Sequence, residues 1–337
     1  MSVSGAPYFE DLHVGLVERR APAVTLTDGM AALHQAIVGD RLALALDATL
    51  ARSVAGAPAA LAHPALVWDV AIGQSTLLTA RVIANLFYRG LVLARIPSIG
   101  DTLRTSTEVV ALRRASPRTD RPASGLAVLR VHTVDQDGRD VLDFWRCAML
   151  PLRDPTAPGG RDDSFDEIPA ELGEQALRAA TASWRLDAMP AAGGGWLARV
   201  EPGTRWTVDG GDVVSSAPEL ARLSLNVAAV HRDRHAHRDG RRLVYGGHTI
   251  GIAAAQASRS LPEIATIVGW HSCEHLAPVH EGDTLYSELE LERVDALSNG
   301  GALAHLRSRV VALGDGGDDD ADGGTPVLDW RFVAVVA

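Results

Sequence analysis

The chain has 337 residues, an apolar fraction of 47% and a formal net charge of −10, which together exclude a disordered chain and a general nucleic-acid-binding surface. Its two cysteines lie far apart in the sequence and no Cys-x-x-Cys motif occurs, so we expect no disulfide framework. No apolar run is long enough to span a bilayer, and no basic-then-apolar leader opens the chain. We therefore expect a cytoplasmic protein without membrane or nucleic-acid partners.

The first half of the chain predicts helices followed by strands. Residues 8–15 resemble a short opening strand and turn. Residues 27–39 predict a helix, because apolar side chains recur at helical spacing behind a capping residue at 27 or 28. A second helical run extends from Ala65 to Val82, after His63 and Pro64. Strand-like runs then close this half at 82–95, 101–113, 126–135 and 141–152.

A segment rich in Pro, Gly and Asp divides the chain. It covers residues 153–190 and contains one short helical stretch near 168–180. Such a composition is typical of a linker rather than of a domain. We therefore predict an N-terminal unit over 1–152 and a C-terminal unit over 191–337.

The two units repeat each other's sequence. Gly-Asp-Thr-Leu occurs at 100–103 and again at 282–285, while Val-Leu-Asp-Phe at 141–144 returns as Val-Leu-Asp-Trp at 327–330. Val14-Gly15 and Pro202-Gly203 extend the same register. Three matches in the same order at nearly constant spacing indicate one duplicated structural unit.

A duplicated unit of this kind predicts an α+β fold. Each unit contains a long helix and several long strands, and a helix covered by a curved antiparallel sheet buries the apolar side of both. The two units are expected to pair as a pseudo-dimer, with their sheets joined edge to edge. The run at 314–324, rich in Gly and Asp, lacks the ligand order and closing Glu of a calcium loop, so we predict a hairpin loop there.

Residues 219–251 carry the polar groups that we expect to perform chemistry. Asn226 precedes His231 by five residues, and Gly246 and Gly247 open an apolar helical run. Glycine lets a ligand approach the N–H groups at the positive end of a helix, where an acyl carbonyl can be bound. We therefore expect a carbonyl-binding site at this helix start.

The first unit lacks this set of groups. Superposing the repeats places Asp40 opposite Asn226 and Ala45 opposite His231. Its longer helix begins at His63-Pro64, and proline has no N–H to offer an oxyanion. The C-terminal unit is thus predicted to be catalytic and the N-terminal unit structural. Asp40 is either a base lent across the pseudo-dimer or a solvated turn residue.

The two-unit layout, the repeated Gly-Asp-Thr-Leu string and the glycines that open the helix resemble the MaoC-like acyl-CoA hydratase/dehydratase superfamily. Members of that superfamily with two such units form a tandem (double) hotdog. That superfamily usually carries Asp-x4-His, whereas this chain has Asn-x4-His at 226–231. The strings at 82–88, 240–248 and 275–278 are similar to the mesaconyl-CoA (2-methylfumaryl-CoA) hydratase group. The resemblance covers nearly all of the chain outside the predicted linker.

The resemblance implies reversible hydration of an enoyl-CoA thioester, most naturally between mesaconyl-CoA and 3-methylmalyl-CoA. His231 would move the proton, Asn226 would orient water or His231, and Gly246 and Gly247 would bind the thioester carbonyl. The remaining substrate-site candidates are Tyr245, His248, His275, Arg241 and Arg242.

The two arginines have two readings. A guanidinium binds phosphate or carboxylate in a forked geometry, so Arg241 and Arg242 would pair with CoA or with a free acyl carboxylate. Alternatively, they only keep their loop soluble. We expect no cofactor beyond the CoA of the substrate. We also expect no metal, because no cysteine or carboxylate completes a site with His231, His235 and His237.

Two other functions remain open at this stage. Loss of the superfamily's Asp in one unit and of its His in the other is compatible with a non-catalytic subunit that binds acyl-CoA or an acyl carrier. A hotdog thioesterase is the third alternative, since the same glycine turn can polarise a carbonyl for hydrolysis. The chain itself is expected to be a pseudo-dimeric monomer, or to assemble further into a homodimer or larger oligomer.

Overall fold

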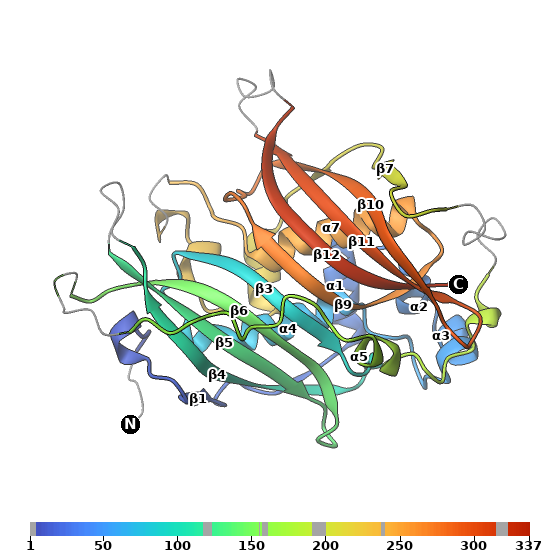
Figure 1. The fold of residues 1–337 in the computed structure, drawn as a ribbon, viewed down its shortest axis with the longest axis horizontal. Helices are drawn as coiled ribbons and strands as arrows, with labels where there is room; N and C mark the ends of the chain where they lie inside the picture. Colours follow the sequence, from blue (N-terminus) through green and yellow to red (C-terminus); the bar gives the residue numbers. More distant parts are fainter. Residues whose placement is uncertain are drawn as a thin grey trace.

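The computed structural model describes residues 5–116, 123–154, 156, 161–190, 200–236, 240–314 and 323–337. Most of the loop predicted at 314–324, and also His237, lie outside the described residues. A 12-stranded sheet runs through the whole molecule, and helices cover one of its faces (Figure 1). No described helix is long and apolar enough to cross a membrane.

The first half contains several helices followed by four long strands. Its elements are η1 (Phe9–Asp11), β1 (Val17–Glu18), β2 (Val24–Thr25), α1 (Asp28–Val38), α2 (Ala43–Leu46), α3 (Ala48–Ala55), α4 (Pro64–Gln74), η2 (Ser75–Leu78), β3 (Ala84–Leu93), β4 (Thr102–Arg114), β5 (Ser124–Val134) and β6 (Asp140–Pro151).

The second half follows the same plan after a connecting segment. Its elements are α5 (Glu174–Ala179), η3 (Leu186–Ala188), β7 (Arg205–Thr207), β8 (Asp212–Val213), α6 (Ala217–Leu223), η5 (Ala229–His231), η6 (Arg234–Ala236), α7 (Gly246–Ser260), β9 (Ile264–His275), β10 (Thr284–Ala296), β11 (Ala302–Leu313) and β12 (Thr325–Val336).

The two half-sheets join edge to edge at β3 and β9. These strands pair antiparallel from Phe87 opposite Glu274 to Val92 opposite Gly269. On either side of the joint the order is β4-β5-β6-β3 and β9-β12-β11-β10, so each half repeats the other. The joint confirms the predicted edge-to-edge pairing and the α+β double-unit fold.

The repeated Gly-Asp strings form the same turn in both halves. Gly100 and Gly282 adopt φ of 106° and 101°, which glycine tolerates far better than other residues. The following aspartates accept hydrogen bonds at 2.9 and 2.8 Å from the backbone N–H groups of Ser98 and His280. The repeat in the sequence therefore reflects a duplicated turn before β4 and β10.

The core lies between the sheet and the two central helices. Every residue of α4 is buried. The Trp68 ring of α4 packs edge-on against Trp270 of β9, with ring centroids 4.7 Å apart. It also lies 6.3 Å from Trp330 of β12. Since Trp68 belongs to the first half and the other two rings to the second, the halves share one core.

Two local predictions were wrong. Residues 9–11 form the short helix η1 rather than an opening strand, and Asp11 caps it by accepting from the Tyr8 N–H at 2.9 Å. The long helix predicted over 65–82 ends as α-helix at Gln74 and continues only as a 3-10 turn to Leu78. Ser75 and Thr76 cause this change, because their hydroxyls bond back to carbonyls of the preceding turn.

The segment predicted as a linker, residues 153–190, packs against the sheet in its described part. Its described part crosses the sheet on the face opposite α4 and α7 (Figure 1). Leu177 is fully buried. The Asn299 amide donates to the carbonyls of Thr181 and Trp184, both at 3.0 Å. The segment thus covers apolar side chains on the outer face of the sheet.

The loop that follows α6 is fixed by the end of α4. A Cβ on Gly73 would lie 1.6 Å from the Ser224 carbonyl oxygen, so only glycine permits this contact. Thr76 accepts a hydrogen bond from the Val227 N–H at 3.0 Å. Between them, Leu225 adopts φ of 62°, a left-handed conformation that the surrounding contacts hold in place.

We expect Gly73→Ala to destabilise the fold by about 1–3 kcal/mol or more, because overpacking at this contact pushes backbone against backbone. Denaturant unfolding of the two proteins measures the difference. Gly29→Ala is the matched control, since a Cβ there meets nothing closer than 3.8 Å. Equal stability of Gly73→Ala and the parent would show that the loop does not depend on this contact.

Candidate active site

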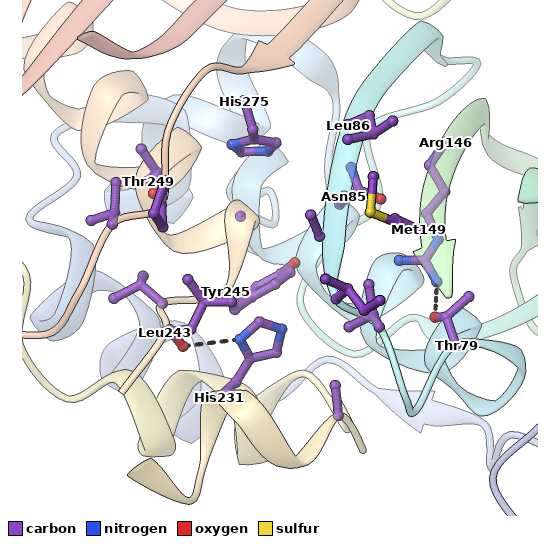
Figure 2. Close-up of a pocket in the computed structure, with 18 of the residues that line it drawn as sticks. Thr79, Asn85, Leu86, Arg146, Met149, His231, Leu243, Tyr245, Thr249 and His275 are labelled. Atoms are coloured by element: carbon purple, nitrogen blue, oxygen red, sulfur yellow. Dashed lines mark hydrogen bonds between the residues drawn. The ribbon is translucent and has the colours of Figure 1, made fainter. Parts of the chain in front are cut away.

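A cavity of about 550 Å³ lies between the two halves and draws its wall from both. Figure 2 shows side chains of the first half, such as Arg146 and Thr79, facing Tyr245 and His231 of the second. The polar residues of the wall are Thr76, Thr79, Asn85, Tyr88, Ser124, Arg146, Asn226, His231, Tyr245, Thr249 and His275. None of the described residues that line it is an aspartate or a glutamate.

His231 stands at the end of η5 with its ring in the cavity wall. Its Nδ1 lies 3.0 Å from the Leu243 carbonyl oxygen (Figure 2). A carbonyl only accepts hydrogen bonds, so the neutral ring carries its proton on Nδ1 and leaves Nε2 as the basic nitrogen. The ring edge packs against Tyr245, with centroids 6.0 Å apart. The surroundings therefore fix both the tautomer and the orientation of His231.

Asn226 also lines the cavity, but one atom of its amide is committed to the backbone. Its Oδ1 accepts a hydrogen bond from the Ala228 N–H at 2.9 Å. This bond closes the turn that leads into η5. Asn226 therefore helps to set the position of His231.

Asp40 makes the corresponding turn in the first half. Its two oxygens accept from the Leu42 N–H at 3.2 and 3.1 Å. The prediction that Asp40 is a solvated turn residue was wrong. Asp40 is only 2% exposed and lies 2.8 Å from Nε2 of His63. Burial alone would raise the pKa of Asp40, but the charge and hydrogen bonding of His63 outweigh it and lower the pKa.

The start of α7 meets the cavity at Gly246. Tyr245 is the N-cap, and among the described residues no side chain caps this helix. The first N–H groups of a helix lack the carbonyl partners of its interior. Here the His248 N–H donates to the Tyr245 carbonyl at 2.9 Å, so the N–H of Gly246, which lies in the cavity wall, is the one suited to a ligand. A Cβ on Gly246 would lie 2.6 Å from His275 Nε2, and one on Gly247 would lie 2.2 Å from the Tyr245 hydroxyl. Both positions therefore require glycine for close packing.

A buried contact between the halves holds Tyr245. Its hydroxyl donates to Asp69 Oδ1 at 2.8 Å, and the other oxygen of Asp69 lies 3.2 Å from His34 Nε2. Burial and the neighbouring charge of Asp69 raise the pKa of Tyr245 well above its ordinary value. Tyr245 thus remains a protonated donor, anchored on α4 of the first half.

His275 lies directly over the helix start. The residue keeps some exposure, but its Nε2 is enclosed and has no hydrogen-bond partner within the described chain. Burial lowers the pKa of His275 to about 4. The ring is therefore neutral near pH 7, when it can donate to or accept from a bound ligand.

Four residues predicted for the site stand outside the cavity wall. Gly247 packs on Asp69, and burial lowers the pKa of the fully enclosed His248 to about 3. Arg241 lies 2.6 Å from Asp283 Oδ1, and Arg242 pairs with Glu281. Both guanidinium groups are thus engaged by carboxylates of their own unit. Asn226, His231, Tyr245, Gly246 and His275 are the predicted residues that the cavity brings together.

The first half contributes more to the cavity than the sequence predicted. The string at 82–88, singled out only by its resemblance, supplies six of the lining residues: Val82, Ile83, Ala84, Asn85, Leu86 and Tyr88. Arg146 of β6 was missed. The signal available was a charged residue at an inward-facing position of the predicted strand 141–152, in phase with Phe144 and Ala148.

The chain is similar over most of its length to two curated enzymes. It shares 30% identity over 320 residues with β-methylmalyl-CoA dehydratase of Chloroflexus aurantiacus, covering 91% of this chain and 88% of that protein. It shares 30% identity over 330 residues with mesaconyl-CoA hydratase of Cereibacter sphaeroides, covering 94% and 92%. No protein-family model matches the chain.

Solved structures repeat the same architecture. A conserved hypothetical protein of Mycobacterium tuberculosis with a double hotdog fold has 50% identity and a TM-score of 0.87, with 98% of each chain covered. A putative MaoC domain dehydratase of Chloroflexus aurantiacus has 26% identity and a TM-score of 0.86, with 100% and 99% covered. The chain therefore belongs to the MaoC-like double-hotdog hydratases and dehydratases, the hydro-lyase family that includes these mesaconyl-CoA and β-methylmalyl-CoA enzymes.

Proposed function

We propose that this chain catalyses the reversible hydration of mesaconyl-CoA to 3-methylmalyl-CoA. The observation that carries the proposal is His231, whose tautomer is fixed by the Leu243 carbonyl in a cavity that also contains the uncapped start of α7. The names of the two curated relatives supply the substrate pair.

The start of α7 is proposed to bind the thioester carbonyl. Adding water to an enoyl thioester places negative charge on the carbonyl oxygen as the double bond is consumed. The N–H of Gly246, together with the positive end of α7, is suited to stabilise that charge. Tyr245 and His275 complete the polar surroundings of this position, one as a hydroxyl that donates its proton to Asp69 and the other as a neutral imidazole.

His231 is proposed to handle both proton transfers. Its Nε2 removes a proton from water while the water oxygen bonds to the β-carbon, and the π electrons move to the thioester as an enolate. The imidazolium then returns a proton to the α-carbon, so the sum is the addition of one water. A single base suffices for this sequence, which agrees with the lack of Asp and Glu in the described cavity wall.

The proposal is tested by incubating the purified protein with mesaconyl-CoA. We expect loss of enoyl-thioester absorbance and a product heavier by one water in the mass spectrum. Release of CoA thiol without a hydrated product would point to a thioesterase and contradict the proposal. An unchanged substrate at enzyme concentrations that saturate it would also contradict it.

A non-catalytic acyl-CoA-binding subunit is the second candidate. It is favoured by one observation, namely that the cavity wall replaces the superfamily's usual aspartate with an amide committed to the Ala228 N–H. Such a subunit would bind mesaconyl-CoA in a calorimeter and leave it unchanged. Turnover that His231→Ala abolishes would exclude this candidate.

Asn226→Asp separates an orienting role from a basic one. The turn should survive, because Asp40 makes the same turn in the first half with a carboxylate. The new charge should repel the substrate's own carboxylate, so we expect kcat/KM for mesaconyl-CoA to fall about tenfold more than for crotonyl-CoA. Steady-state rates with the two esters measure this ratio. Equal or improved rates with mesaconyl-CoA would show that the site accepts a second base.

A further inference from the structure

Arg146 is a buried cation in the wall of the cavity. The residue is only 3% exposed, and Figure 2 shows its side chain on the side of the cavity opposite Tyr245 and His231. Among the described residues, no aspartate or glutamate forms an ion pair with it. Buried charges are normally paired, because an unpaired one loses its hydration without compensation. Arg146 therefore stands out among the polar groups of the cavity.

The hydrogen bonds that hold Arg146 at the end of η2 use one of its three nitrogens, and the neighbouring Tyr88 hydroxyl offers its guanidinium a further hydrogen bond. Nη2 donates to Thr79 Oγ1 and lies 3.4 Å from the Ser75 carbonyl oxygen, which ties the side chain to the end of η2 (Figure 2). Nε is enclosed and has no hydrogen-bond partner in the described structure. A structural role at the helix end thus explains how the side chain is held, but leaves the donor at Nε unsatisfied.

The fold does not require a cation at this position. The repeat of Val141-Leu-Asp-Phe as Val327-Leu-Asp-Trp places Phe332 at the position of Arg146 in the other half. Phe332 is fully buried, as the alternation of an inward-facing row predicts. Burial lowers the pKa of Arg146, and the nearby Tyr88 and Tyr245 hydroxyls offset this only in part. A buried guanidinium in place of an aromatic ring therefore indicates a ligand that carries negative charge.

We propose that Arg146 binds the free carboxylate of a dicarboxylic enoyl-CoA, and thereby selects such substrates over esters of monocarboxylic acids. The proposal rests on the proposed hydration of mesaconyl-CoA and assigns the part of the cavity that recognises its acid group. A guanidinium matches a carboxylate through two parallel N–H···O bonds, which fix direction as well as charge.

The position of Arg146 favours an acyl carboxylate over the phosphates of CoA. Only a group that enters the cavity between the two halves reaches a side chain as enclosed as this one. In mesaconyl-CoA the carboxylate is attached to the β-carbon, to which water adds. Holding the carboxylate would therefore also hold the reacting carbon in front of His231, which lies in the same cavity.

The test compares mesaconyl-CoA with 2-methylbut-2-enoyl-CoA, which replaces the carboxylate by a methyl group. For Arg146→Met we expect kcat/KM with mesaconyl-CoA to fall roughly 10²–10³-fold, the usual consequence of leaving a buried charge without its partner. The rate with the methyl ester should change less than about threefold, or rise, because an unpaired cation is removed from its path. Equal losses with both esters would overturn the proposal.

Two further variants separate recognition from folding. Arg146→Lys keeps the positive charge but loses the two parallel N–H donors of the guanidinium. We therefore expect it to retain part of the preference for mesaconyl-CoA that Arg146→Met loses. Arg130→Met removes a guanidinium from the neighbouring strand β5, where it pairs with Asp143 and is about half exposed. This control should keep both rates. Loss of the preference in Arg130→Met but not in Arg146→Met would contradict the assignment.

Binding measurements distinguish failure of this inference from failure of the proposed function. The His231→Ala variant cannot turn over the substrate and so allows binding to be measured. In this variant, Arg146→Met should lower the affinity for mesaconyl-CoA at least about tenfold and leave the affinity for free CoA unchanged. Equal weakening of free CoA would place Arg146 at the nucleotide and overturn the inference alone. Hydration of the methyl ester, but not of mesaconyl-CoA, by the unmodified protein would overturn both this inference and the substrate of the proposed function, while the protein would still be a hydratase. Hydration of neither ester would contradict the proposed function itself.

Discussion

His231→Ala is expected to lower turnover of mesaconyl-CoA by roughly 10²–10⁴-fold, the range for removing a positioned acid/base group. The Leu243 carbonyl accepts the hydrogen bond from Nδ1 of this cavity-wall imidazole, which leaves Nε2 as the base. The affinity for mesaconyl-CoA should change much less, since most of the ligand contacts other parts of the wall. Steady-state kinetics and calorimetry measure the two quantities separately.

A nearby histidine provides the control. His235 lies four residues further on, in the exposed turn η6, and its backbone N–H bonds to Asp233 at 2.9 Å. His235→Ala should therefore keep the parent rate. Near-full activity of His231→Ala would remove the base from the mechanism and direct attention to His275, the other imidazole of the cavity.

Gly246→Ala is expected to lower kcat/KM roughly 10²-fold, because a displacement of about 1 Å at the reacting groups has this effect. The added Cβ would lie 2.6 Å from His275 Nε2, so either the imidazole or the helix start must move. The loss of stability should be smaller than for Gly73→Ala, because the clashing atom belongs to a side chain here and to the backbone there. Rates and melting curves of the variant check both statements.

The His275→Ala background shows whether the clash is the cause. Removing the imidazole gives the new methyl group room, so Gly246→Ala/His275→Ala should be no slower than His275→Ala alone. The comparison forms a double-mutant cycle with a strong coupling between the two sites. If Gly246→Ala lowers the rate equally in both backgrounds, its effect does not arise from the contact with His275.

Much of the fold followed from the sequence because the repeat is local and strict. Gly100-Asp101 and Gly282-Asp283 form the same left-handed turn before a strand. The repeated string Gly-Asp-Thr-Leu therefore marks the same structural element in both halves. The end of the long helix was not foreseen. Ser75 and Thr76 bond back to helix carbonyls and tighten the turn, an effect that apolar spacing does not register.

The candidate site was predicted from one half only, and this explains what was missed. Asn226, His231 and Gly246 lie within a short stretch, so spacing alone brought them together. Asp69 and Arg146 come from the other half. Asp69 reaches Tyr245, and Arg146 reaches the cavity wall, only because the two halves pack together. Contacts between distant segments are set by the tertiary fold, which a single sequence does not display.

The division of the chain into one unit that ends at 152 and a second that begins at 191 remains a prediction. The halves share a core around Trp68 and one continuous sheet, so neither half buries its apolar surface alone. We therefore expect activity only from a chain that contains both halves.

The most direct test of the central claim is the reaction of the intact protein with mesaconyl-CoA in water enriched in oxygen-18. We predict a 3-methylmalyl-CoA product that carries the heavy oxygen on the β-carbon, with the thioester intact and no release of CoA. The same label should appear far more slowly with His231→Ala. Heavy oxygen in a free acid, with release of CoA, or no incorporation at all, would contradict the assignment of this chain as a hydratase.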